Sequence, residues 1–101
     1  MMPRLIIGCL LAGVIAGMLL IAPAFAQDKK AIDYFHDGVA HYSSGDYHAA
    51  IDDYDKAIAL DPDDAASYNN RGIAKRELGQ HQSAEADFKK ACQLDQTLSV
   101  C

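Results

Sequence analysis

The stretch YFHDGVAHYSSGDYHAAIDDYDKAIALDP, from Tyr34 to Pro62, is matched place for place by YNNRGIAKRELGQHQSAEADFKKACQLDQ, from Tyr68 to Gln96. The two stretches are 34 residues apart, and most of the shared positions hold small or aromatic side chains. The first copy carries Tyr34, Gly38, Gly45, Ala50, Tyr54, Ala57, Leu60 and Asp61, which recur as Tyr68, Gly72, Gly79, Ala84, Phe88, Ala91, Leu94 and Asp95. A fixed period of this length is typical of an array of helix-turn-helix units.

Turn and capping residues divide each copy into two helices. Gly45 can end the first helix in a left-handed conformation, and Asp46 can cap the next. Pro62 disfavours a helical conformation at the residue before it, and Asp63 or Asp64 can cap the third helix. We therefore expect helices from about Ala31 to the turn at residues 44–45, and over residues 47–60, 65–78 and 82–94. Asp28 is the predicted N-cap of the first helix, and short connections make neighbouring helices antiparallel.

The two copies resemble tetratricopeptide (TPR) repeats, with repeat one at residues 31–64 and repeat two at residues 65–98 of a domain over residues 27–101. The resemblance implies an all-α fold, in which two helix-turn-helix units form a short right-handed solenoid. It also implies a protein-protein interaction module whose concave groove takes an extended peptide or a partner helix. The groove residues that it implies are Ile32, Phe35, His36, Val39, Tyr42, Asn69, Asn70, Ile73 and Arg76.

Several positions depart from the TPR pattern. Gln96 stands where the proline of the first copy would recur, so the last helix is expected to extend beyond Leu94. Asp37 and Arg71 fill a slot that the pattern usually gives to leucine, and we expect an ion pair between them across the two units. Only Asn70 matches the Lys and Asn set with which one TPR subclass grips a C-terminal carboxylate. We therefore expect an apolar or aromatic-bearing ligand.

The N-terminal segment has the features of a secretory signal peptide. Arg4 gives it a positive start, and an apolar run extends over residues 5–21. Small residues at Ala24 and Ala26 suit a signal peptidase, which predicts cleavage after residue 26 and an exported, periplasmic or secreted protein. The alternative is an uncleaved signal anchor that keeps the same domain on the membrane.

Charge is distributed unevenly over the expected mature chain. Residues 27–101 hold 8 Lys or Arg and 14 Asp or Glu, a net charge of −6. Repeat one carries −8 and repeat two +1. Such a chain has no electrostatic attraction for nucleic acid or an anionic membrane, and its acidic first unit disfavours acidic ligands. The expected partner is a protein or peptide.

Two cysteines, Cys92 and Cys101, remain after the signal peptide. An even pair in an oxidising compartment favours a disulfide, and the tail from Asp95 is long enough to fold back over the open end of the array. The sequence equally allows a buried Cys92 with a free or intermolecular Cys101. Two units fall below the roughly three repeats that such stacks usually need, so homo-oligomerisation or a permanent partner is another way to cover the ends. Self-association as a structural element is therefore the second functional hypothesis.

No pattern of catalytic or ligand-binding residues stands out. The histidines, His36, His41, His48 and His81, are separated by five, seven and 33 residues, which does not place two of them on one helical turn. The serines lack a Gly-x-Ser-x-Gly elbow, and the acidic turn at residues 61–64 lacks the glutamate that closes an EF-hand loop. We expect no enzymatic activity, no cofactor and no metal.

Overall fold

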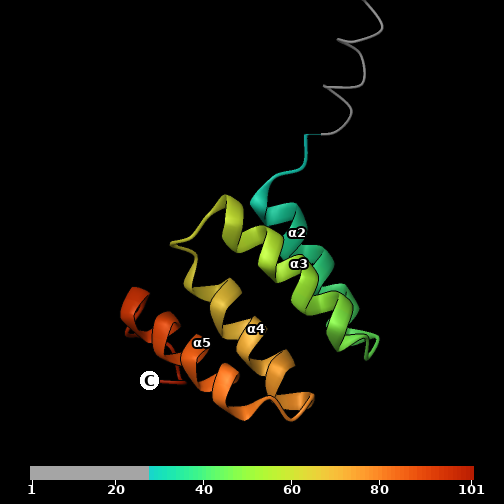
Figure 1. Cartoon of the computed structure of the whole chain (residues 1–101). Helices are drawn as coiled ribbons and strands as arrows, with labels where there is room; N and C mark the ends of the chain where they lie inside the picture. Colours follow the sequence, from blue (N-terminus) through green and yellow to red (C-terminus); the bar gives the residue numbers. More distant parts are fainter. Residues whose placement is uncertain (1–27) are drawn as a thin grey trace, which may run out of the picture.

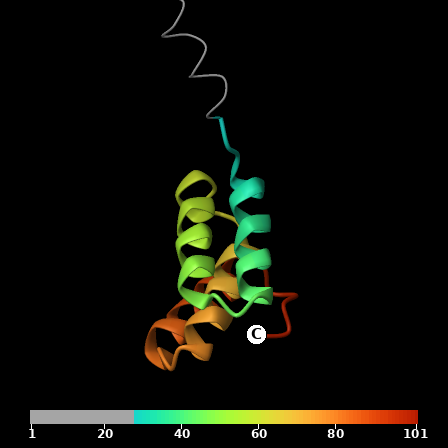
Figure 2. The same cartoon turned by 90° about the vertical axis from the view of Figure 1, so that its right-hand side faces the viewer.

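The computed structural model describes residues 28–101, so the expected signal peptide lies outside the described residues. The described chain holds four helices, α2 (Ala31–Ser43), α3 (Tyr47–Leu60), α4 (Ala65–Glu77) and α5 (His81–Leu94). Helices α2 and α3 form one antiparallel hairpin, α4 and α5 form the second, and α4 packs against α3 (Figures 1 and 2). Residues 28–101 contain no strand, which confirms the predicted all-α class.

Glycine and aspartate make the turns, as the sequence predicts. Gly45 and Gly79 have φ angles of 82° and 79°, a left-handed conformation that residues with a side chain rarely adopt. The Asp46 carboxylate caps α3 by accepting a hydrogen bond from the backbone N–H of Ala49 at 3.1 Å. Asp64 caps α4 in the same way. Each hairpin and the connection between them are therefore fixed by local chemistry.

Small residues let the helices of each hairpin approach closely. A methyl group at Gly38 would lie 2.6 Å from Cε1 of Tyr54, and one at Gly72 would lie 2.6 Å from Cε1 of Phe88. The alanines at the crossings, Ala50, Ala57, Ala84 and Ala91, are all at most 1% exposed. The core is thus built twice from the same parts, an aromatic ring over a glycine between alanines.

Polar contacts repeat at the same 34-residue offset. His41 Nδ1 lies 2.6 Å from an Asp53 oxygen in the first hairpin, and Lys75 Nζ lies 2.9 Å from an Asp87 oxygen in the second. Lys56 Nζ lies 5.7 Å from the centre of the Tyr34 ring, and the matching pair, Lys90 and Tyr68, is 6.0 Å apart. The repeat therefore specifies polar contacts as well as the apolar core.

Two predictions about helix ends are wrong. The first helix begins at Ala31, too far from Asp28 for that side chain to cap it, and Asp33 instead accepts a hydrogen bond from the backbone N–H of Lys30. The last helix ends at Leu94, although no proline comes after it. Asp95 accepts hydrogen bonds from both the backbone N–H and the hydroxyl of Thr97, which turns the chain. Helices α4 and α5 otherwise begin and end within one residue of the prediction.

The predicted ion pair between Asp37 and Arg71 is also wrong. Asp37 pairs with Lys29, which precedes α2, while the Arg71 guanidinium donates two hydrogen bonds to Asp87 and one to Asp55. The bidentate geometry at Asp87 and the second acceptor on α3 give Arg71 better partners than the more distant α2 offers. Arg71 therefore ties α4 to α5 and to the first repeat.

Candidate functional site: the concave face

The nine predicted groove residues, here called the concave face, lie on α2 and α4. On α2 the most accessible are Ile32 and Val39, which are 53% and 39% exposed. The rings of Phe35 and Tyr42 are partly buried: Phe35 packs 5.9 Å from Tyr54, and Tyr42 packs against a residue of α3. The α2 half of this face is therefore an apolar strip with two accessible aliphatic side chains and two anchored rings.

Tyr42 connects the two halves of the concave face. Burial raises the pKa of its hydroxyl, and the nearby Glu77 carboxylate at the end of α4 raises it further, while Arg76 acts in the opposite direction. The hydroxyl therefore lies close to charged groups of the second repeat. The C-terminal ends of α2 and α4 therefore border the same surface.

The α4 half is more polar and less open. Asn69, Asn70 and Ile73 are partly buried, and Arg76 is exposed. Burial raises the pKa of the Tyr54 hydroxyl, an effect that the nearby Asn70 side chain opposes. Asn70 is therefore directed toward the core of the first repeat, and it contributes to the contact between repeats.

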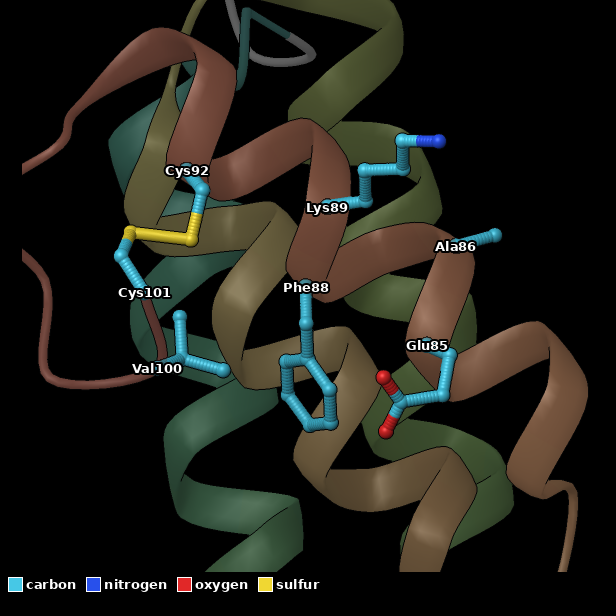
Figure 3. Close-up of a pocket in the computed structure, with 7 residues that line it drawn as sticks. All are labelled: Glu85, Ala86, Phe88, Lys89, Cys92, Val100 and Cys101. Carbon is cyan, nitrogen blue, oxygen red and sulfur yellow. A yellow bond between two sulfur atoms is a disulfide. The ribbon is translucent and has the colours of Figure 1, made fainter.

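The C-terminal tail borders the α4 half. Asn69, Ile73 and Arg76 share a cavity of about 270 Å³ with Phe88 and with two tail residues, Ser99 and Val100. On the α5 side, Val100 also lines a cavity of about 480 Å³ beside Glu85, Lys89 and the cysteines (Figure 3). A disulfide joins Cys92 to Cys101 across nine residues, with Cα atoms 5.5 Å apart. The tail thus lies over the open end of the array, next to the concave face.

The sequence profiles of a known repeat family match both copies. The profile described as "TPR repeat" matches residues 38–76, and the one described as "Tetratricopeptide repeat" matches residues 65–98. The chain belongs to the tetratricopeptide-repeat family. The resemblance drawn from the 34-residue spacing is therefore confirmed, with two TPR units in the described chain.

Curated relatives match one part of this TPR protein. It is 41% identical over 51 residues to the photosystem I assembly protein Ycf3 of Emiliania huxleyi, and 39% identical over 46 residues to that of Guillardia theta. The matches span 50% and 46% of this chain but only 30% and 27% of the relatives. These relatives therefore support the repeat and leave the activity of the whole protein open.

A solved structure supports the same fold. The first TPR of Spaghetti (RPAP3), bound to the HSP90 peptide SRMEEVD, superimposes with a TM-score of 0.69 at 30% identity. The match covers 70% of this chain and 56% of that one. The arrangement of two stacked hairpins is therefore that of a known peptide-binding TPR domain.

Charges beneath the surface of this TPR domain are paired. Asp87, 4% exposed, accepts hydrogen bonds from Arg71 at 2.6 and 2.9 Å, and Lys75 lies 2.9 Å away. The bonds to Asp87 are the main reason that the pKa of Arg71 is raised above its ordinary value. Among residues 28–101, no group of three or more His, Cys, Asp or Glu side chains is arranged to hold a metal ion.

Sequence reasoning missed the residues that border the TPR groove from the tail and from α5. The pairing of the two cysteines was an open alternative, but Ser99, Val100 and Phe88 had no role at the concave face. The 34-residue register contained a signal for Phe88, because Phe88 matches Tyr54, the α3 residue against which α4 packs. Within residues 28–101, no helix has the length and apolar character of a membrane span.

Proposed function

We propose that residues 27–101 form an exported protein-interaction module that binds an apolar peptide or helix segment on its concave face. The observation that carries this proposal is the pair of accessible aliphatic side chains, Ile32 and Val39, beside anchored aromatic rings on the α2 half of a TPR fold. Aliphatic side chains beside rigid rings can anchor a ligand segment without a large cost in side-chain entropy. Its mechanism is recognition, with no reaction step.

Charge sets the kind of ligand. The peptide bound by the similar RPAP3 domain, SRMEEVD, contains three acidic residues. Repeat one of this chain carries nine aspartates against a single lysine, Lys56. Because like charges repel, the ligand of this domain is proposed to be neutral or basic. Export would place both partners outside the cytoplasm.

A peptide library displayed on phage can test this proposal without knowledge of the natural partner. Peptides selected on residues 27–101 are titrated against Ile32→Ser/Val39→Ser, with Leu60→Ser as the matched control. Leu60 is 57% exposed but lies at the end of α3, outside the concave face. Loss of two apolar contacts should weaken binding by about tenfold or more, while the control stays unchanged. Equal binding by all three proteins would disprove the assignment.

Export is tested separately by the intact mass of the protein made with its N-terminal segment. A mature chain that begins at Gln27 supports cleavage. The mass of the full 101 residues, recovered with membranes, would instead support the signal-anchor alternative. Neither outcome changes the prediction for the concave face.

Self-association is the second candidate function, and one observation favours it. Ala74, one helical turn after Asn70 on α4, is 0% exposed, whereas Ala40, its counterpart on α2, is exposed. Within residues 28–101, the surface of α2 that corresponds to the stacking surface of α4 is therefore uncovered. A second copy could cover it.

A further inference from the structure

One face of the α4/α5 hairpin looks away from the first repeat, and it is here called the end face. Its residues on α5 are Glu85, Phe88, Lys89 and Cys92, which line the 480 Å³ cavity. In the 34-residue register they match Ile51, Tyr54, Asp55 and Ile58 on α3. The end face is therefore the second copy of the surface on which α4 stacks.

The contacts of α4 show what such a surface receives. Arg71 on α4 donates a hydrogen bond to Asp55 at 2.7 Å, and Asn70 lies beside the Tyr54 hydroxyl. One register further along, Phe88 and Lys89 take the places of Tyr54 and Asp55. A helix stacked on the end face in the same way would pack its middle against Phe88. It would also place a charged side chain beside Lys89.

The C-terminal tail covers part of the end face. Val100 of the tail lies beside Phe88, much as Asn70 of α4 lies beside Tyr54 in the first repeat. The disulfide holds the tail against Cys92 (Figure 3). Cavities of about 480 and 270 Å³ border Val100 on its two sides. The short tail therefore fills less of the end face than a helix would, and the disulfide keeps it there.

We propose that the end face binds α2 of a second copy of this chain, and that the Cys92–Cys101 disulfide closes this stacking site. This inference rests on self-association, the second function proposed above, and it specifies the two surfaces and their control. In the 34-residue register Arg71 corresponds to Asp37, and Asp55 corresponds to Lys89. Both charges reverse sign, so the ion pair between Arg71 and Asp55 has a counterpart between copies: Asp37 of one copy would pair with Lys89 of the next.

Asp37 is suited to pair with a lysine of another copy. Arg71 has a second partner in its own hairpin, Asp87, but the matching residue beside Asp37 is another acid, Asp53. Asp37 pairs instead with Lys29, and both side chains are more than 40% exposed. An exposed pair of this kind contributes little stability, so exchange of Lys29 for the lysine of another copy costs little.

Opening of the stacking site on the end face requires a dithiol reductant. One of its thiolates attacks a sulfur of the disulfide, the Cys92–Cys101 bond breaks, and a mixed disulfide forms. The second thiol of the reductant then displaces the cysteine. The two cysteines gain two electrons and two protons and become thiols, while the reductant becomes a disulfide. Val100 is then free to leave Phe88.

The contact would join two different surfaces, the α2 face of one copy and the end face of the next. Such a head-to-tail contact leaves one surface of each kind free at the ends of every assembly, so assemblies can grow beyond a dimer. The disulfide would then act as the stop that keeps the oxidised chain monomeric.

Sedimentation velocity of residues 27–101 over a range of concentrations tests the proposal. We expect monomers in the oxidised protein, and assembly that increases with concentration after treatment with dithiothreitol. Cys101→Ser should assemble without reductant, because its tail is never tethered. A reduced chain and a Cys101→Ser chain that both remain monomeric at all concentrations would overturn self-association itself. Equal assembly with and without reductant would overturn only the role of the disulfide.

Charge reversal tests the register of stacking, in the Cys101→Ser background. Lys89→Glu and Asp37→Lys should each weaken association by about tenfold or more, and the two together should restore it. Lys90→Glu is the matched control, because the neighbouring Lys90 lies over the Tyr68 ring of its own hairpin. If Lys89→Glu leaves the association constant unchanged, or if Lys90→Glu lowers it equally, the proposed contact is overturned while self-association remains.

Discussion

Gly72 lies so close to Phe88 that no side chain fits between them. A methyl group at Gly72 would lie 2.6 Å from Cε1 and 2.9 Å from Cδ1 of the Phe88 ring. The distances from Gly38 to Tyr54 are the same. The closest helix approach of each hairpin therefore depends on one glycine and one ring, and it is the part of the fold most sensitive to added volume.

Gly72→Ala should destabilise the domain by about 1–3 kcal/mol, despite the better helix propensity of alanine. Phe88 is 5% exposed and the ring edge that meets the new methyl group cannot move into solvent without opening the hairpin. Urea unfolding measures the change. Phe88→Leu in the same chain should reduce the cost of Gly72→Ala, and a cost that stays the same would contradict the steric explanation.

The alanines at the helix crossings give a second test of packing. Ala50→Leu and Ala84→Leu each add three heavy atoms where the native side chain is at most 1% exposed, and each should cost about 1–3 kcal/mol. Ala66→Leu, at an exposed position of α4, is the control and should change stability little. Unchanged urea midpoints for both core variants would refute the predicted pairing of the helices.

The parts of the fold that were predictable are those that depend on local sequence. Gly45 and Gly79 end their helices, Asp46 and Asp64 cap the next ones, and the offset from Gly38 to Gly72 fixes the same crossing twice. The partner of Arg71 was mispredicted because it depends on which of several acids is nearest in space. Repeat spacing identifies equivalent positions, but it does not rank Asp37, Asp55 and Asp87 as acceptors.

Asp87 should be the most important charged residue for stability. Its carboxylate is 4% exposed and lies between Arg71 and Lys75. Asp87→Ala therefore leaves the partly buried Lys75 without this acceptor and leaves Arg71 with only its exposed partner, Asp55. Breaking such a pair from one side should cost about 3–5 kcal/mol. Asp55→Ala is the control: it removes only the exposed partner of Arg71 and should cost less than about 1 kcal/mol. Similar urea midpoints for the two variants would show that burial does not distinguish the two acids.

The turn that begins the tail should depend on pH. Hydrogen bonds from Thr97 hold the pKa of the Asp95 carboxyl below its ordinary value. A lowered folded pKa means that the stabilisation is fully present above the unfolded pKa of 3.8 and is lost as the pH falls through the folded pKa. Titration of the Asp95 side chain by NMR should show this low pKa, and Thr97→Val should raise it. An Asp95 pKa that is the same in both proteins would contradict the role of Thr97.

The position of the tail was harder to predict than the position of the helices. Nothing in the helical periodicity places Val100 beside Phe88, because that contact results from a covalent bond and a turn at Asp95. The concave face raises the same difficulty. The register assigned residues to α2 and α4, but the border formed by Ser99 and Val100 required the path of the tail.

Cys101→Ser should lower the free energy of unfolding by about 2–3 kcal/mol, because the disulfide restricts a short loop in the unfolded chain. Cys101 is exposed and lies at the end of the tail, so serine introduces no clash and leaves the helices intact. Urea unfolding of the oxidised wild type and of the variant gives the difference. Reductant should shift the wild type toward the variant and leave the variant unchanged. Equal midpoints, together with two free thiols per wild-type chain on alkylation, would show that the cysteines are not paired in solution.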